Sequence, residues 1–276
     1  MAAAGDEVRA AGCAGDDESG KVEAAGESSK KQATNAYGNY RGYYKTSYRD
    51  GAADARPELI PVSAVAGKSL LDIGCNSGLL TLKLLASHGP ASVLGIDVDQ
   101  RLIAHARQRL REMEPELAAN ARFACCDIMA VAAGKPVPSA LLPQAYVMPE
   151  RKLRSQDVKS SSAVQRGKTK FGVVLALSVS KWIHVHHGDA GLISFFELVY
   201  DLLDGPGSVF VLEPQPWSSY RKRCRFLPGL SDVIHTLQLR PDGFERLLLD
   251  TIGFTACSRL TNEGNFGKRE MLMFIK

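Results

Sequence analysis

Two acidic residues and two glycines are spaced in a way that suits the binding of a nucleoside. Asp72 lies in an apolar run at 69–73 that leads into Gly74 and Gly78, and a second apolar run ends on Asp97. In an open α/β sheet, such ligands bind where the ends of adjacent parallel strands meet. The glycines allow a tight turn and a close approach of the backbone to a ligand. The Asp97 carboxylate can accept hydrogen bonds from both hydroxyls of a ribose.

The glycine spacing distinguishes between two kinds of nucleoside ligand. A dinucleotide site requires Gly-x-Gly-x-x-Gly, with the pyrophosphate at the helix N-terminus. This chain instead has Asp-x-Gly-x-x-x-Gly, with Asp97 following 19 residues after Gly78. The pattern resembles motif I of class I S-adenosylmethionine-dependent methyltransferases, whose cofactor has no pyrophosphate. A methyltransferase is therefore favoured over a nicotinamide enzyme, and glycines that merely close a strand–helix turn would leave Asp97 unexplained.

Three further segments carry side chains that suit the end of an RNA. A tyrosine-rich segment at 37–49 precedes the first apolar run, Ser-x-x-Lys-Trp-Ile-His occupies 178–184, and Glu-Pro-Gln-Pro-Trp occupies 213–217. The last two segments follow apolar runs, at the strand ends where ligands of α/β sheets lie. Stacking on an aromatic side chain is worth about 1–3 kcal/mol per base, and a lysine offers a point charge to phosphate.

Apolar runs alternate with helical patterns over most of the chain. We expect strands at 69–74, 92–97, 121–128, 171–179 and 208–213, helices at 78–88, 99–113, 189–203 and near 241–251, and a last hairpin of 255–260 and 270–275. Such alternation predicts an α/β fold with a largely parallel sheet, and the hairpin adds an antiparallel pair at its edge.

Charge and composition predict one domain with two appendages. Residues 1–30 hold seven acidic and three basic side chains and few large apolar ones, so we expect a disordered acidic tail. Residues 31–276 then form a single methyltransferase domain with a flexible basic insertion at about 130–169. Since the whole chain has a net charge of +4, this domain carries +8. A basic body suits an anionic substrate such as RNA.

Apolar run lengths, the first residues and the cysteine spacing disfavour several classes of protein. No run approaches the roughly eighteen apolar residues of a membrane span, and the first residues lack the basic and apolar regions of a secretory signal. The six cysteines form no Cys-x-x-Cys pair, which favours reduced thiols over zinc or disulfides. We expect no membrane, no metal, a monomer, and a nuclear location, with the cytoplasm as the alternative.

Four motifs together resemble the bicoid-interacting methyltransferase family. They are Tyr-Gly-Asn-Tyr at 37–40, Leu-Asp-Ile-Gly-Cys-Asn at 71–76, Lys-Trp-Ile-His at 181–184 and Leu-Glu-Pro-Gln-Pro-Trp at 212–217. The resemblance implies the class I S-adenosylmethionine-dependent methyltransferase fold, an α/β fold. Its seven-stranded mixed sheet is mostly parallel with an antiparallel C-terminal hairpin, and helices cover both faces. It also implies S-adenosylmethionine as cofactor and methyl transfer to the 5′-terminal γ-phosphate of a small nuclear RNA.

The resemblance implies roles for individual residues as well. Cofactor contacts would fall on Tyr44, Arg56, Gly74, Cys75, Asn76, Asp97, Val98, Asp127, Ile128 and Leu177. The catalytic residues at the phosphate would be Lys181, Tyr43 and His184, and RNA contacts would fall on Trp182, Glu213, Gln215 and Trp217.

Two alternatives stay open at this level. One is an RNA 5′-monophosphate methyltransferase, and the other is an RNA-binding scaffold that keeps the cofactor site with little turnover. The sequence shows no obvious Ser-His-Asp set, and an ionised phosphate oxygen needs no general base, so alignment and electrostatic positioning could suffice for catalysis. RNA is the expected partner, and RNA-associated proteins are further candidates.

Overall fold

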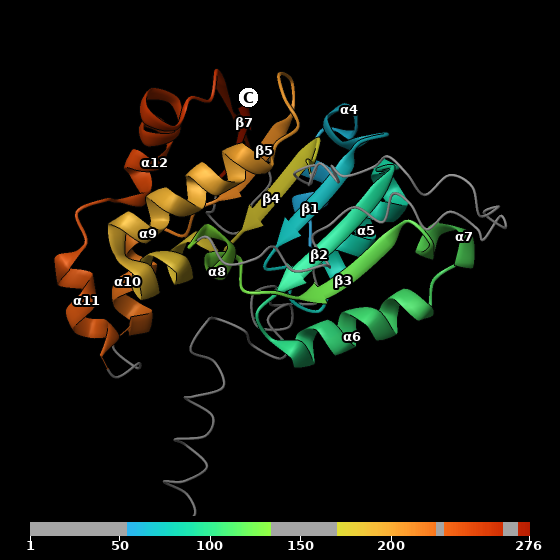
Figure 1. Ribbon diagram of the computed structural model, residues 1–276, viewed down its shortest axis with the longest axis horizontal. Coiled ribbons are helices and arrows are strands. Elements are labelled where there is room, and N and C mark those ends of the chain that lie inside the picture. Colours follow the sequence, from blue (N-terminus) through green and yellow to red (C-terminus); the bar gives the residue numbers. More distant parts are fainter. Residues whose placement is uncertain (1–53, 134–169, 225–228, 262–269) are drawn as a thin grey trace, which may run out of the picture. The chain divides into compact units, whose positions relative to one another are not determined.

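Seven strands form one mixed sheet in the part of the chain that the computed structural model describes, residues 54–133, 170–224, 229–261 and 270–276 (Figure 1). The strands are β1 (Ser69–Ile73), β2 (Ser92–Asp97), β3 (Ala121–Cys125), β4 (Val173–Leu177), β5 (Val209–Glu213), β6 (Ala256–Leu260) and β7 (Met271–Ile275). Their order in the sheet is β3-β2-β1-β4-β5-β7-β6. The pairs among β1 to β5 are parallel, and β7 is antiparallel to both β5 and β6. The predicted sheet is confirmed.

Helices cover both faces of this sheet. They are α3 (Arg56–Leu59), α4 (Val62–Val65), α5 (Leu79–His88), α6 (Gln100–Arg111), α7 (Pro115–Ala118), α8 (Ile128–Ala132), α9 (Ser180–Leu202), α10 (Trp217–Cys224), α11 (Leu230–Thr236) and α12 (Phe244–Leu247). A 3₁₀ turn, η3 (Pro241–Gly243), precedes α12, and a π turn, η4 (Leu248–Ile252), follows it. Buried residues of α4, α5 and α6 pack on one face, and those of α8, α9 and α12 pack on the other.

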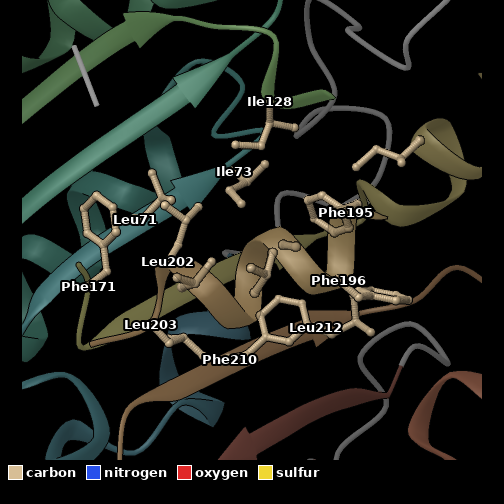
Figure 2. Packing of buried hydrophobic residues seen from close by; sticks show 14 of the residues in the cluster. Leu71, Ile73, Ile128, Phe171, Phe195, Phe196, Leu202, Leu203, Phe210 and Leu212 are labelled. Carbon is tan, nitrogen blue, oxygen red and sulfur yellow. The ribbon is translucent and has the colours of Figure 1, made fainter. Parts of the chain in front are cut away.

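The core consists of two apolar layers that share the central strands. In β4, Val174 faces the layer that contains α9, whereas Val173 faces the layer that contains α5. Figure 2 shows the first layer, in which Phe196 of α9 and Phe210 of β5 lie with their ring centroids 6.3 Å apart. Parallel strands buried on both faces read as continuous apolar runs, which is why the sequence located them well.

Two element boundaries differ from the predicted ones by three residues or more. Helix α9 begins at Ser180, nine residues before the expected start, and it continues across a break at Gly188, where φ is 68° and ψ is −172°. The side chains from 180 to 185 are all buried, so the first turns show no polar face and no helical period. Strand β3 ends at Cys125 because Asp127 begins α8, its carboxylate accepting a bond from the Met129 amide.

Short helices were not predicted at all. Helices α3, α4, α7 and α8 have four or five residues, α11 has seven and α10 has eight. Fewer than about three turns give too few repeats for a hydrophobic period to be recognised. The predicted acidic tail and most of the predicted insertion lie outside the described residues. Within the described residues, no helix is both long enough and apolar enough to cross a bilayer.

Strand β6 forms one edge of the sheet and carries a charged side chain there. Arg259 is exposed and forms ion pairs with Glu270, which precedes β7, and with Glu245 of α12. The other β6 residues are at most half-buried.

The turn between β1 and α5 requires two glycines in the left-handed region. Gly74 and Gly78 both have a φ of 76°. A Cβ on Gly74 would lie 2.3 Å from Cγ2 of Val179, which follows β4, and a Cβ on Gly78 would lie 2.8 Å from the Phe123 ring. Both the backbone angle and the close packing therefore exclude larger residues. The sequence predicted the tight turn at Gly74 and Gly78 but not the packing against Val179 and Phe123.

We expect Gly74→Ala to destabilise the protein more than Gly67→Ala. Gly67 also has a positive φ, of 68°, but nothing lies within 4 Å of its added Cβ. Both substitutions therefore incur the left-handed backbone penalty of about 1–2 kcal/mol. Only Gly74→Ala adds the collision with Val179, worth about another 1–3 kcal/mol. Urea unfolding measures the difference, and equal losses for the two variants would show that Val179 is not packed on Gly74.

Candidate functional site

The Asp97 carboxylate joins the loops that follow β1 and β2. Its Oδ2 accepts a hydrogen bond from the Asn76 amide at 3.0 Å, and its Oδ1 accepts one from the Asp99 amide at 2.9 Å. Burial raises the pKa of Asp97, and the backbone hydrogen bonds oppose that shift. Each carboxylate oxygen has more than one acceptor site, so these bonds orient the group without exhausting its capacity to bind a ligand.

The predicted backbone cradle at 74–76 is held by the protein itself. The amides of Gly74 and Cys75 both donate to the Ile96 carbonyl, at 2.8 and 2.9 Å. Asn76 has a left-handed φ of 53°, and its side-chain oxygen accepts a bond from the Ser77 amide. A ligand could therefore approach the backbone of this turn closely, but the amides of Gly74 and Cys75 already bond within the protein. Cys75 is buried, and burial raises the pKa of its thiol well above the ordinary range.

Two exposed apolar side chains lie in the segments that follow β1 and β2. Val98, which follows β2, is 42% exposed, and Leu79 at the start of α5 is 41% exposed. Val98 lies in the loop after β2, and Leu79 begins the helix that follows the loop after β1. Exposed large apolar side chains at one place can mark a ligand surface. Val98 was predicted as a cofactor contact and Leu79 was not, although Leu79 directly follows Gly78 of the glycine motif.

The next strand end adds two of the predicted residues. Asp127 is exposed after β3, and its Oδ1 accepts a 2.9 Å bond from the Met129 amide. Ile128 is buried in the α9 layer. Because β3 lies beside β2 in the sheet, these residues lie on the same side as Asp97. Leu177, at the end of β4, is buried in the α5 layer.

A buried carboxyl group lies within β1. Asp72 is 3% exposed, and burial raises its pKa to about 6, against the effects of the Thr81 hydroxyl and the charge of Arg56. The Thr81 hydroxyl of α5 donates to Asp72 Oδ2. The interior of the sheet thus holds an acid that titrates close to neutral pH.

Arg56 lies between two carboxylates from distant parts of the chain. Its Nε and Nη2 donate to Asp54, and its Nη1 donates to Glu213 Oε2 at 2.8 Å. The same Glu213 oxygen accepts a 2.9 Å bond from the Ser178 hydroxyl. The predicted cofactor residue Arg56 and the predicted RNA residue Glu213 are therefore direct partners. Glu213 is 4% exposed and acts within the protein network.

Lys181 extends from the first turn of α9 to the first turn of α10. Its Nζ donates to the Ser219 hydroxyl at 2.9 Å and lies 4.6 Å from the centroid of the Trp182 ring. The side chain is largely buried. The two helices follow β4 and β5, which are adjacent strands, so the ammonium group lies at the carboxyl edge of the sheet. Ser219 was not predicted, although it follows the Glu-Pro-Gln-Pro-Trp motif by two residues.

His184 is placed inside the protein and not at a phosphate-binding surface. It is 0% exposed, its Nδ1 lies 3.3 Å from the Tyr220 hydroxyl and its Nε2 lies 2.7 Å from Asp189 Oδ1. Burial lowers its pKa, although the hydrogen bond to Asp189 acts in the opposite direction. Asp189 also accepts bonds from the amides of Gln238 and Leu239. This arrangement supports a role for His184 in holding α9, α10 and the segment after α11 together, in place of the expected phosphate contact.

The two tryptophans differ in their surroundings. Trp182 is 9% exposed and packs in a cluster with Tyr220 and Ile234, so the expected stacking on an RNA base has little surface available. Trp217 is half-buried, with the Arg240 guanidinium 4.0 Å from its ring centroid and the Tyr220 ring centroid 4.8 Å away. Trp217 therefore keeps more surface in contact with solvent than Trp182 does.

Gln215 is also internal. It is 3% exposed, its Nε2 donates to the Ser178 carbonyl, and its Oε1 accepts a 3.2 Å bond from the Lys181 amide. Direct RNA binding by this side chain, as the resemblance implied, does not fit these contacts. Tyr43 and Tyr44 lie outside the described residues. Among the described residues, no group of three or more His, Cys, Asp or Glu side chains could hold a metal ion.

The sheet order, the glycine turn after β1 and the carboxylate that ends β2 define a class I S-adenosylmethionine-dependent methyltransferase fold. A methyltransferase-domain model matches residues 70–141. Among solved structures, the N-methyltransferase NodS of Bradyrhizobium japonicum, in complex with S-adenosyl-L-homocysteine, is similar in fold. Its TM-score is 0.51 at 14% identity, over 90% of this chain and 97% of NodS.

The family follows from two further matches. The model of Bicoid-interacting protein 3 (Bin3) matches residues 171–276. A probable RNA methyltransferase of Arabidopsis thaliana is 34% identical over 251 residues, which are 84% of this chain and 77% of the relative. The chain therefore belongs to the Bin3 family of methyltransferases. The 7SK snRNA methylphosphate capping enzyme of Homo sapiens is 30% identical over 279 residues, covering 90% of this chain but 40% of the human protein.

Asp72 should make stability depend on pH. Its folded-state pKa of about 6 lies above the ordinary 3.8, so the folded protein binds this proton more tightly than the unfolded chain does. The stabilisation is therefore complete below about pH 4 and is lost as the pH rises through about 6. Asp72→Asn removes this titration. Relative to wild type, the variant's free energy of unfolding should rise by about 2 kcal/mol from about pH 4 to pH 7.

Urea unfolding at a series of pH values, for both proteins, measures this trend. A constant difference between Asp72→Asn and wild type would mean that Asp72 titrates as an exposed carboxyl does.

Proposed function

We propose that the protein transfers a methyl group from S-adenosylmethionine to the 5′-terminal γ-phosphate of a small nuclear RNA. The observation that carries the proposal is the Lys181 ammonium beside the Ser219 hydroxyl, at the strand ends that adjoin the glycine turn. Members of the family named for RNA methylation and RNA capping support it. Such a substrate would place the protein in the nucleus.

The residues at the ends of β1 and β2 fit this cofactor. Asp97 would accept bonds from the ribose hydroxyls, and the exposed Val98 and Leu79 would cover the faces of adenine. Gly74 and Gly78 leave room that a Cβ would fill. When bound, S-adenosylmethionine supplies a methyl group activated by a sulfonium.

The charges around Arg56 fit the other end of the cofactor. Carboxyl groups outnumber the single guanidinium in this region. Asp54 and Glu213 bond Arg56, Asp72 interacts electrostatically with Arg56, and Asp97 interacts electrostatically with Asp72. A sulfonium and an ammonium are both cationic, so they favour an acidic environment. The guanidinium of Arg56 would orient the carboxylate of the methionyl part, because its planar set of N–H donors matches the geometry of a carboxylate.

The phosphate end requires a cation and no base. The Lys181 ammonium would bind a phosphate oxygen, and the Ser219 hydroxyl beside it could donate a second hydrogen bond to the phosphate. Two of the predicted site residues that could act as a base are already engaged: Glu213 binds Arg56 and Ser178, and His184 is buried between Tyr220 and Asp189. The terminal phosphate ionises a second time near pH 6 for monoesters, so its oxygen is a nucleophile at neutral pH without help.

The rest of the RNA would meet positive charge on α10. Arg221 and Lys222 are exposed there, one turn beyond Ser219. Neutralising phosphates releases counterions, so RNA affinity should fall as salt rises. These contacts would hold the RNA irrespective of its sequence.

We expect Asp97→Ala to weaken the binding of S-adenosylmethionine. The loss of hydrogen bonds to a charged acceptor should cost about 1.5–3 kcal/mol, or roughly tenfold to a hundredfold in affinity. Asp99→Asn serves as the control, because Asp99 caps α6 from the same loop and asparagine caps equally well. Calorimetric titration of both folded variants tests the assignment, which fails if Asp97→Ala binds as tightly as Asp99→Asn.

The methyl group should reach the terminal phosphate. Incubation with labelled S-adenosylmethionine and matched RNAs with 5′-triphosphate, 5′-monophosphate and 5′-hydroxyl ends should label the triphosphate RNA. Removal of the 5′ phosphates should release the label, and the rate should be nearly constant from about pH 7 to 9, above the second phosphate ionisation. Label retained on the RNA body would refute the proposal. Labelling of the monophosphate RNA alone would indicate the monophosphate reaction, and cofactor binding without turnover would indicate a scaffold.

Lys181→Ala should remove most of the preference for a phosphorylated end. Loss of a charge-assisted hydrogen bond costs about 1.5–3 kcal/mol, so the affinity ratio of 5′-triphosphate to 5′-hydroxyl RNA should fall at least about tenfold. Lys68→Ala removes the same charge at the opposite ends of the strands, since Lys68 directly precedes β1. Equal ratios for Lys181→Ala and Lys68→Ala would show that Lys181 does not bind the phosphate.

A further inference from the structure

Helix α9 lacks the usual hydrogen-bonding cap at its N-terminus. The first N–H groups of a helix have no acceptor within the helix, and Val179 at the cap position offers no side-chain acceptor. The amide of Lys181 nevertheless donates to Oε1 of Gln215, at 3.2 Å. Gln215 follows β5 and is 34 residues away in sequence. The helix that carries Lys181 is therefore capped from the neighbouring strand end.

The same glutamine holds the turn that precedes the helix. Ser178 has a left-handed φ of 62°, a conformation that costs a residue with a side chain about 1–3 kcal/mol. Its carbonyl accepts a bond from Gln215 Nε2, its amide donates to the Glu213 carbonyl at 3.1 Å, and its hydroxyl donates to Glu213 Oε2. A strained conformation persists when surrounding contacts determine it fully, and here those contacts come from β5 and the residues after it.

Two prolines flank Gln215 and restrict where its side chain can lie. Pro214 and Pro216 fix their own φ angles and lack N–H groups, so the segment has little freedom to bring the glutamine elsewhere. Buried side-chain amides must be hydrogen-bonded, and both ends of the Gln215 amide are used. One side chain thus spans the turn from the carbonyl of residue 178 to the amide of residue 181.

We propose that Gln215 is a positioning residue for Lys181. It acts from inside the protein: its two hydrogen bonds fix the left-handed turn at Ser178 and the start of α9, and so place the Lys181 ammonium beside Ser219. The proposal rests on the proposed function for the role of Lys181 at the phosphate. It replaces the direct RNA contact that the sequence suggested for Gln215.

The first test uses Gln215→Met, which keeps the approximate shape and removes both hydrogen bonds. The turnover of 5′-triphosphate RNA should fall about tenfold to a hundredfold, because a displacement of about 1 Å at a reacting group can cost that much. The affinity for S-adenosylmethionine should fall much less than the turnover, since Asn76, Asp97 and Val98 lie at the ends of β1 and β2 and share no hydrogen bond with Gln215. Gln108→Met is the matched control, because Gln108 is an exposed glutamine of α6 that bonds Glu112, and it should behave as wild type.

A second test measures the bond itself. In wild type, the Lys181 amide should exchange its hydrogen with solvent slowly, and in Gln215→Met this protection should be lost. Gln215→Glu separates the two bonds, because it keeps an acceptor for the Lys181 amide and loses only the donor to Ser178. It should retain the protection of the Lys181 amide, and it provides a second variant where Gln215→Met does not fold.

A double-mutant cycle decides between positioning and direct contact. If Gln215 acts through Lys181, then Gln215→Met should change the triphosphate-to-hydroxyl affinity ratio in wild type and should hardly change it in the Lys181→Ala background. Equal effects in both backgrounds would overturn the proposal, as would unchanged exchange of the Lys181 amide in Gln215→Met. A wild type that methylates no 5′-phosphorylated RNA would refute the proposed function instead, and the exchange experiment would then decide alone whether the Gln215 bond exists.

Discussion

The buried Glu213 carboxylate joins three parts of the chain. It ends β5, it receives the Arg56 guanidinium from α3, and it receives the Ser178 hydroxyl from the end of β4. Removing one partner of a buried ion pair typically costs about 3–5 kcal/mol, because the other charge stays buried without compensation. Neither Arg56 nor Glu213 can therefore move independently. The strand ends that we propose for the cofactor and the turn that leads to Lys181 are joined through this one carboxylate.

The carboxyl ends of the strands carry two regions of opposite charge, one around Arg56 and one that begins at Lys181. Around Arg56, carboxyl groups outnumber the cation, and burial raises the pKa of Asp72 and of Asp97. Beyond Lys181 and its partner Ser219, α10 carries the exposed cations Arg221 and Lys222. A cationic methyl donor and an anionic acceptor would each find a region of opposite charge. Such pre-arranged charges contribute to catalysis because they need not reorganise during the reaction.

The sequence located the sheet accurately and the roles of the polar motifs less well. The strands are apolar on both faces, and glycines mark their turns, so strands and turn positions could be read directly. Polar motifs are harder, because Lys-Trp-Ile-His looks the same whether its side chains face a ligand or one another. His184 and Trp182 proved to be internal because both pack against Tyr220 of α10, and Gln215 is internal because it bonds Ser178 after β4. Only three-dimensional pairing could reveal that.

The charged edge of the sheet has a consequence for association with other chains. An edge strand presents unpaired backbone groups that can template pairing with another strand, and natural sheets protect such edges with charged side chains. Strand β6 has this protection, since Arg259 stands on it in ion pairs with Glu245 and Glu270. A second chain that added itself there would have to desolvate these groups. The fold thus resists edge-to-edge aggregation at β6, the outer strand of its antiparallel hairpin.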